Sequence, residues 1–180
     1  AIAAGADLLM LPMFETAEQV AEFTALVKGR ARVIPLVETP AAMANFEEIL
    51  AVNGVDEVYI GLNDLHMALG LDFMFELLAD GSVERMAAAC RKAGMPFGFG
   101  GIARMEEGLL PGELVLAEHL RLGSSAVILS RTFHRSSTSL DEMHANLDFA
   151  HEVERLREHE TRLAGRDANE IAADHRQLLE

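Results

Sequence analysis

The stretch Val33-Ile-Pro-Leu-Val-Glu-Thr-Pro40 decides the fold class. Its first five residues form a short continuous apolar run, which is typical of a strand covered on both faces of a parallel sheet. Pro35 is unusual inside a strand and indicates an irregular ladder position. Thr39 as N-cap and Pro40 at the first helical position predict a helix that runs through Leu50. The stretch therefore predicts one strand–helix unit.

The same alternation continues along the chain, which is the pattern of an α/β protein with a parallel sheet. Further strands are expected at residues 8–11, 57–60, 96–99 and 126–130. Further helices are expected at residues 17–27, 82–92 and 113–122, with Thr16 and Ser82 as N-caps and Gly94 and Gly123 at the ends. The segment Gly61-Leu-Asn-Asp64 is expected to be a loop after the third strand. Five strands fall short of an eight-stranded barrel, which needs about 200 residues or more, so we expect part of one.

The last quarter of the chain differs in composition. A polar connector, Ser136–Ser139, is expected to cap a helix. A single helical apolar stripe is then predicted from Leu140, Met143, Leu147, Ala150 and Val153. The chain opens in an Ala-rich run that reads like the end of a helix, without an initiator Met, so we expect the C-terminal part of something longer.

The bulk composition restricts the function classes. A net charge of −14 argues against binding to nucleic acid or to an anionic membrane surface, since both require clustered Lys and Arg. The single cysteine, Cys90, excludes an intrachain disulfide, is expected to be a buried thiol, and suits a reducing cytoplasm. No apolar run approaches the ~20 residues that span a bilayer, and the start lacks a basic signal-peptide region.

Two carboxylates follow neighbouring predicted strands. Glu38 comes directly after residues 33–37, and Asp64 follows residues 57–60. The carboxyl ends of parallel strands meet at one edge, so these side chains are expected to converge there. Mg²⁺ prefers carboxylate oxygens and often takes only one or two of them from the protein. Equally, both residues could simply cap the helices that follow, where a carboxylate is favoured.

Three blocks carry a family resemblance. Residues 33–49, VIPLVETPAAMANFEEI, resemble the LIETPEALxNLxEI block of the HpcH/HpaI aldolase/citrate lyase family. Residues 54–65, GVDEVYIGLNDL, resemble its GVDGxxIGPNDLS block, and residues 5–18, GADLLMLPMFETAE, resemble its GADGIMLPKVESAEE segment. The blocks occur in the family's order over roughly the first seventy residues.

The resemblance implies a metal-dependent carbon–carbon lyase of the class II aldolase type on a phosphoenolpyruvate/pyruvate-type (β/α)₈ barrel. Glu38 and Asp64 would bind Mg²⁺ or Mn²⁺, and backbone N–H groups around Gly61, Asn63 and Asp64 would face the carboxylate of a 2-keto acid such as pyruvate. The cation would stabilise the enolate formed when the carbon–carbon bond breaks or forms. A cytoplasmic homo-oligomer is expected.

Two alternatives remain open. Leu36 agrees with the citrate lyase branch, whose substrate would be an acyl-CoA ester, whereas Pro12-Met13 agrees with the aldolases. The other alternative is a non-catalytic half-barrel fragment that associates with itself or a partner, because open sheet edges need cover. The family's earlier strands supply a substrate-binding Arg and a proton-transferring His, and no segment here matches them. The catalytic residues are therefore unassigned.

The chain also departs from the family blocks. Leu62 stands where the family has Pro, a modest packing change, and His66 stands where it has Ser. His66 either touches substrate or, as we favour, lies outside direct contact. In the divergent second half, Arg104 and Arg131 beside a glycine-rich strand end (Gly98, Gly100 and Gly101) could hold a carboxylate or phosphate. The alternative that we favour is a tight turn with ordinary surface arginines.

The remaining histidines favour no zinc site. His144, His151 and His159 are expected to form a solvated or oligomer-facing stripe, and His119 to be a helix-surface or packing residue. The expected organisation is the C-terminal part of a (β/α)₈ barrel with the metal site in residues 1–134. A helical tail, 135–180, would pack on the barrel or on a neighbouring subunit.

Overall fold

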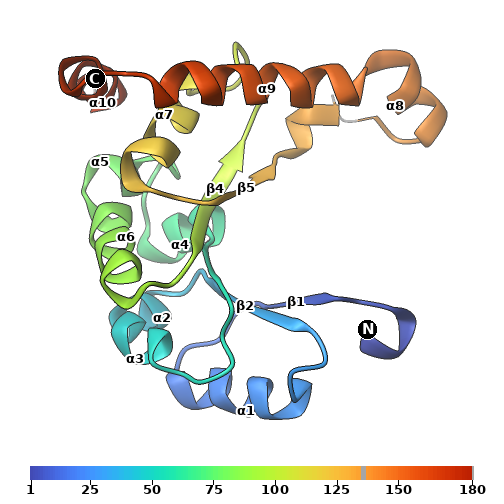
Figure 1. Ribbon diagram of the computed structural model, residues 1–180, viewed down its shortest axis with the longest axis vertical. Helices are drawn as coiled ribbons and strands as arrows, with labels where there is room; N and C mark the ends of the chain where they lie inside the picture. Colours follow the sequence, from blue (N-terminus) through green and yellow to red (C-terminus); the bar gives the residue numbers. More distant parts are fainter. Residues whose placement is uncertain (135–136, 180) are drawn as a thin grey trace. The chain divides into compact units, whose positions relative to one another are not determined.

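The computed structural model describes residues 1–134 and 137–179, which divide into two compact units. The first comprises Ala1–Gly100 with Ser124–Ala126, and the second comprises Gly101–Gly123 with Val127–Glu180. The strands are β1 (Leu8–Leu11), β2 (Arg32–Val37), β3 (Val58–Ile60), β4 (Phe97–Ile102) and β5 (Ala126–Leu129) (Figure 1). The helices of the first unit are η1 (Ile2–Ala4), α1 (Ala17–Val27), α2 (Pro40–Ala44), α3 (Phe46–Leu50), α4 (Leu62–Leu69), α5 (Glu76–Ala79) and α6 (Ser82–Ala93). Those of the second unit are α7 (Gly112–Leu122), η2 (Arg131–His134), α8 (Leu140–Asn146), α9 (Phe149–Ala164) and α10 (Ala168–Leu179).

The strands follow the order β1-β2-β3-β4-β5. The pairs β1–β2, β2–β3 and β3–β4 are parallel, with Leu36 opposite Tyr59 and Tyr59 opposite Gly98. β5 continues this direction, because the N–H groups of Ser125 and Ser130 donate to the carbonyls of Phe97 and Ile102, both at 2.9 Å. The predicted α/β class and the five predicted strands are confirmed within the described residues.

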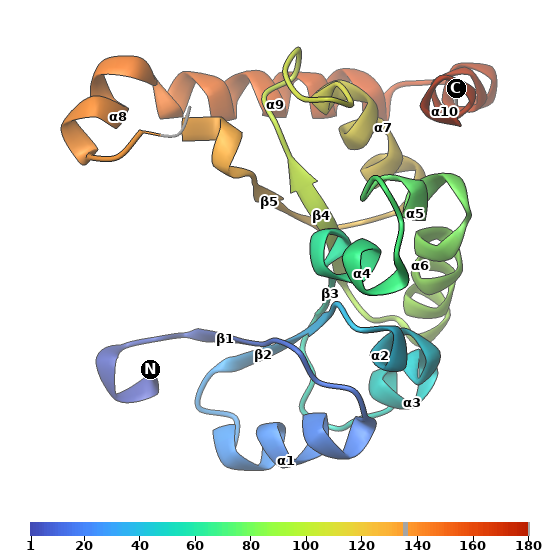
Figure 2. The same ribbon diagram turned by 180° about the vertical axis from the view of Figure 1, so that it is seen from behind.

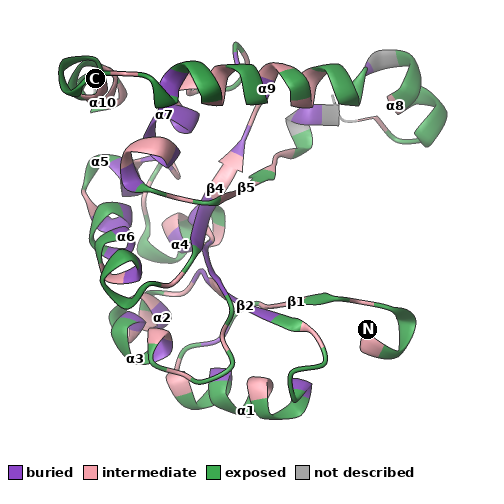
Figure 3. Cartoon of the chain, viewed as in Figure 1, coloured by how far each residue is buried: buried purple, intermediate pink, exposed green. Residues whose placement is uncertain are grey.

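Burial differs between the strands in the middle of the order and those at its ends. All three residues of β3 are buried, whereas no residue of β1 is (Figure 3). The Tyr59 ring of β3 packs directly against Gly98 of β4. A Cβ on Gly98 would lie 2.5 Å from the Tyr59 ring, and the Tyr59 hydroxyl donates to the carbonyls of Phe99 (3.0 Å) and Gly100 (2.6 Å). Figures 1 and 2 both show α3 and α5 beside α6, on the outside of these strands.

Two of the three predicted N-cap residues of the first unit cap their helices, and the third does not. Thr16 caps α1 in a capping box with Gln19, and Thr39 caps α2 with Pro40 in its first turn, as predicted. Ser82 is not a cap. It is the first residue of α6, and its N–H donates to Oδ1 of Asp80 at 2.7 Å. The N-cap position belongs to Gly81, and no side chain makes a capping hydrogen bond there.

Two expected elements of the first unit also differ. The helix predicted from Pro40 through Leu50 is split into α2 and α3 at Asn45, whose side chain donates to the Glu15 carbonyl at 3.1 Å. The expected loop after β3 is instead the start of α4. Leu62, almost fully buried, begins that helix, and Gly61 is its N-cap.

The second unit is helical around α7, which packs against α9 and α10. Glu118 of α7 is 2% exposed, accepts from Arg121 at 2.9 Å and lies 3.0 Å from Nδ1 of His175 on α10. Arg166, which follows α9, donates to the Ala117 carbonyl at 3.1 Å and pairs with Asp174. The buried Glu118 carboxylate, through His175, and Arg166 therefore join α10 to α7.

The predicted single stripe after residue 140 is wrong. α8 ends at Asn146, and Asp148 caps α9 by accepting from the His151 N–H at 3.0 Å. Leu140 is exposed, whereas Leu156 and Leu163 are the buried residues of α9. Ser139 caps α8 as expected, while Ser136 lies outside the described residues. Within residues 1–134 and 137–179, no helix combines the length and apolar character needed to cross a membrane.

Candidate functional site

Glu38 lies immediately after β2 and is 4% exposed. Its Oε1 accepts the backbone N–H of Met13 at 3.0 Å. Burial raises the pKa of Glu38, and the negative charge of Asp64 raises it further, while the Met13 N–H opposes both effects. Thr39, not Glu38, caps the following helix. The alternative that Glu38 is only a helix cap is therefore not supported.

Asp64 lies in the first turn of α4, directly after β3. Gly61 is the N-cap of this helix, and no side chain makes a capping hydrogen bond there. Asp64 is half-buried, and its charge acts on Glu38. The structure therefore brings together the two carboxylates that the strand ends predicted. The first-turn position also suits a negative charge, because the helix dipole is positive there.

Gly61 packs directly against Glu38. A Cβ on Gly61 would lie 2.9 Å from Cβ of Glu38, 3.1 Å from its Oε2 and 3.1 Å from Cδ1 of Leu36. The Gly61 N–H donates to the Val37 carbonyl at 2.9 Å, so it is not available to a substrate and that expected role is corrected. What Gly61 contributes instead is space beside the Glu38 carboxylate.

Asn63 and Asp64 are the other two residues predicted to present backbone N–H groups to a substrate. Both belong to the first turn of α4, whose N–H groups have no acceptor within the helix. The Asn63 side chain is exposed. His66, one turn further along, has its Nδ1 3.2 Å from the Leu62 carbonyl of the same helix. His66 is half-buried, and its ring contacts the backbone of its own helix.

The donor set at this site consists of oxygen atoms. Among the residues that the structure describes, no group of three or more His, Cys, Asp and Glu side chains could hold a metal ion. Two adjacent carboxylates nevertheless match the way Mg²⁺ and Mn²⁺ are held when substrate and water complete the shell. The raised pKa of Glu38 also suits a cation. A positive charge at the site would offset the cost of burying the Glu38 carboxylate and its repulsion by Asp64.

Sequence reasoning missed Met13. This residue adopts φ of +52°, in the left-handed region that favours Gly, Asn and Asp, and it donates its N–H to Glu38. Nothing in its residue type signals that conformation. The only hint is its place after a predicted strand, where functional loops gather.

Arg104 fits neither of the two interpretations of the second half, the surface arginine that we favoured or the anion site. Arg104 is 4% exposed, and its Nε and Nη2 donate to the Phe133 carbonyl at 3.1 and 2.6 Å. Its Nη1 lies 3.8 Å from carboxylates of Glu107 and Glu152. Arg104 is neither a surface arginine nor available to a ligand. It fixes η2 within the second unit, while Arg131 is exposed.

The other single residues of interest behave as structural groups. Cys90 is buried, as expected, and burial raises the pKa of its thiol to about 12. His119 is a buried packing residue, and burial lowers its pKa to about 3, so it is neutral at pH 7. His144 lies on α8 whereas His151 and His159 lie on α9, so the three do not share one helix.

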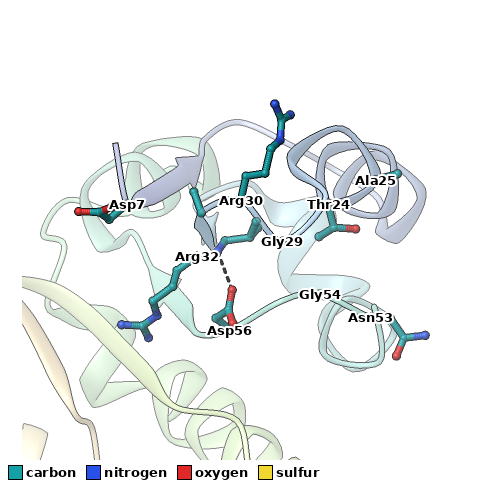
Figure 4. A pocket seen from close by; sticks show the side chains of 11 residues that line it. Asp7, Thr24, Ala25, Gly29, Arg30, Arg32, Asn53, Gly54 and Asp56 are labelled. Atoms are coloured by element: carbon teal, nitrogen blue, oxygen red, sulfur yellow. Dashed lines mark hydrogen bonds between the residues drawn. The ribbon is translucent and has the colours of Figure 1, made fainter. Parts of the chain in front are cut away.

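A hollow of about 600 Å³ lies at the opposite, amino ends of β1 and β2. Figure 4 shows the guanidinium groups of Arg30 and Arg32 and the amide of Asn53 pointing away from one another. Both arginines are also engaged: Arg30 donates to the Val27 carbonyl at 2.9 Å, and Arg32 pairs with Glu57 at 3.2 Å. These polar groups do not converge on a ligand as those of a binding site do. The Glu38–Asp64 edge therefore remains the candidate site.

Comparison with known proteins is most informative for the first unit. The sequence model of the HpcH/HpaI aldolase/citrate lyase family matches residues 1–107. A 4-hydroxy-4-methyl-2-oxoglutarate aldolase, cghB, of Chaetomium globosum is 37% identical over 76 residues, which cover 42% of this chain and 28% of that protein. A hydroxypyruvate/pyruvate aldolase of Rhizorhabdus wittichii is 36% identical over 80 residues, covering 41% and 32%. The chain thus spans about a third of the length of these curated relatives.

Solved structures support the fold. An HpcH/HpaI aldolase/citrate lyase family protein from Burkholderia cenocepacia matches with a TM-score of 0.62 at 19% identity, covering 87% of this chain and 67% of that one. An HpcH/HpaI aldolase from Desulfitobacterium hafniense matches with a TM-score of 0.57 at 20% identity, covering 72% and 59%. RipC from Yersinia pestis matches with a TM-score of 0.57 at 20% identity, covering 92% and 66%.

Proposed function

Because the chain belongs to the HpcH/HpaI aldolase/citrate lyase family, we propose that it carries the cation-binding part of a carbon–carbon lyase acting on a 2-keto acid. Both curated relatives are named as aldolases, one of an oxoglutarate derivative and one of pyruvate and hydroxypyruvate. These names favour a 2-keto acid over an acyl-CoA ester. The five strands with their helices would then be part of a (β/α)₈ barrel.

The observation that carries the proposal is the meeting of Glu38 and Asp64 at the carboxyl ends of β2 and β3. Glu38 is buried, is not used as a cap, and has its pKa raised by burial and by Asp64. A buried charge of this kind is costly unless something compensates it. A divalent cation between the two carboxylates is the compensation that the family resemblance also implies.

Glu38 and Asp64 would hold the cation, which when bound would act as a Lewis acid on the keto oxygen of the substrate. The chain's own groups would do the rest of the binding. The N–H groups of Asn63 and Asp64, in the first turn of α4, would donate to the substrate carboxylate, where the helix dipole favours negative charge. Gly61 would keep the space between this turn and Glu38 open, because any side chain there would meet Glu38.

Exchange of the pyruvate methyl protons with solvent deuterium tests the proposal. We expect exchange that depends on Mg²⁺ or Mn²⁺ and is lost in Glu38→Gln and Asp64→Asn. Glu22→Gln, an exposed carboxylate of α1, is the matched control and should exchange like the parent. Undiminished exchange in Glu38→Gln would refute the assignment of Glu38. No exchange in the parent with either cation would count against the lyase proposal itself.

A further inference from the structure

The loop Pro12–Glu15, between β1 and α1, combines an unusual backbone with an exposed side chain. Met13 has φ of +52°, which L-residues with side chains rarely adopt. Its side chain is 59% exposed, so packing does not explain why the backbone holds this conformation. Positive φ in a residue other than glycine persists only where the surrounding structure determines it, and it gathers at functional sites. Contacts from elsewhere in the first unit must therefore hold the loop.

The loop is held from the segment that carries the site. The Thr39 hydroxyl donates to the Phe14 carbonyl at 2.8 Å, and the Asn45 side chain donates to the Glu15 carbonyl at 3.1 Å. Phe14 itself is buried. These contacts fix the residues that follow Met13, while β1 fixes those that precede it. The consequence is that the Met13 N–H is directed at Glu38.

The two oxygens of the Glu38 carboxylate have different surroundings. Oε1 accepts the Met13 N–H at 3.0 Å. Oε2 lies beside Gly61, only 3.1 Å from where a Cβ on that residue would be. No hydrogen bond from the described part of the chain reaches Oε2. Gly61 is the N-cap of the helix that carries Asp64.

We propose that Met13 is a positioning residue whose backbone N–H occupies one oxygen of Glu38 and directs the other toward the cation site. The inference rests on the proposed function, since it assigns Met13 a role in the same cation site. The amide would hold the carboxylate in one rotation, so that Oε2 is the oxygen presented beside Asp64. Groups that hydrogen-bond a ligating carboxylate in this way typically contribute 10–100-fold to metal affinity.

The test measures Mn²⁺ affinity from the electron paramagnetic resonance signal of free Mn²⁺, with a thermal melt of each variant. Met13→Pro removes the N–H and is expected to weaken Mn²⁺ binding by roughly 10–100-fold. Met13→Val keeps the N–H but disfavours positive φ, so it should weaken binding to a lesser degree. Met13→Gly and Met13→Asn accept positive φ and keep the N–H, so they should bind Mn²⁺ like the parent.

Lys28 provides a matched control. It is the other non-glycine residue with positive φ in the described part of the chain, at +55°, and its N–H caps α1 by donating to the Thr24 carbonyl at 2.9 Å. Lys28→Pro therefore removes an N–H from the same backbone conformation, but one that donates to the Thr24 carbonyl and not to Glu38. It should lower the melting temperature and leave Mn²⁺ affinity unchanged.

The outcomes separate the inference from the proposed function. If the parent binds Mn²⁺, Glu38→Gln does not, and Met13→Pro binds like the parent, the inference alone is overturned. Equal losses in Met13→Gly and Met13→Pro would overturn it as well, because they would assign the effect to the side chain. If Met13→Pro does not fold, a Met13→Val variant that binds like the parent overturns it. A parent without Mn²⁺ affinity overturns the proposed cation site, and the inference with it.

Discussion

Asp64 lies near enough to Glu38 for its negative charge to raise the pKa of that buried carboxyl. The raised pKa means that folding takes up a proton at Glu38 between the ordinary value of 4.5 and the folded value. The folded state therefore loses stability as the pH rises through that window. Above that window, the cation-free site should keep two carboxylates together at the expense of the fold.

We predict that Glu38→Gln melts at a higher temperature than the parent without added cation, with a gain that appears above pH 4.5 and then levels off. Each pKa unit corresponds to about 1.4 kcal/mol, or roughly 3–6 °C for a protein of this size. Asp64→Asn should give a smaller gain, because it removes only one of the causes. Melting curves from pH 4 to 8 check this, with Glu22→Gln as the control. A Glu38→Gln variant that is less stable above pH 6 would contradict the prediction.

The second prediction concerns Gly61. Its φ is negative, so glycine is required there only because a side chain would not fit. Gly61→Ala places a Cβ 2.9 Å from Cβ of Glu38, so the carboxylate must move. We expect the free energy of unfolding to fall by about 1–3 kcal/mol and Mn²⁺ binding to be lost. Gly165→Ala is the matched control, because its Cβ would meet only the Arg162 carbonyl at 3.5 Å. Chemical denaturation measures the free energy of unfolding of both variants, and Mn²⁺ titration measures their affinity. A Gly61→Ala variant that binds Mn²⁺ like the parent would refute the prediction.

Local pattern was sufficient to place every strand, because each is a short apolar run bounded by turn or helix-start residues. The errors occur where the hydrogen bond of one side chain overrides the apolar periodicity. Asn45 interrupts a predicted helix because its side chain reaches the Glu15 carbonyl, thirty residues away. The predicted stripe after Leu140 is broken because Asp148 starts a new helix. Neither contact can be read from periodicity.

The candidate site could be predicted in part for a geometric reason. Parallel neighbouring strands put Glu38 and Asp64 at one edge, whatever the details of packing. The donors around them could not be predicted in the same way. The Met13 N–H belongs to the backbone and leaves no mark on residue type, and the Gly61 N–H is taken by Val37 only once the strands are paired. Arg104 was misplaced because burial of an arginine depends on its partner, here the Phe133 carbonyl.

The third prediction concerns Cys90, which is buried in α6 with its pKa raised to about 12. The thiolate is the reactive form, so the native thiol should be nearly inert at pH 8. With Ellman's reagent we expect no fast labelling of the folded chain and one thiol per chain in denaturant, since the sequence has a single cysteine. Rapid stoichiometric labelling under native conditions would show that α6 does not bury this residue as described.

The fourth prediction concerns His119, buried in α7, whose pKa burial lowers to about 3 from the ordinary 6.5. Between these values the unfolded chain binds a proton that the folded chain does not, so stability falls as the pH falls from about 6.5 to 3. One proton contributes about 1.4 kcal/mol per pH unit to that slope. His119→Gln, which cannot titrate, should therefore unfold with a shallower dependence on pH than the parent. The slope is the quantity to compare, because the substitution can change packing and so shift stability equally at every pH. Denaturation at half-unit steps from pH 7 to 4 measures it, with the exposed His151→Gln as the matched control. An unchanged slope in His119→Gln would mean that His119 is protonated, or accessible to water, in the folded state.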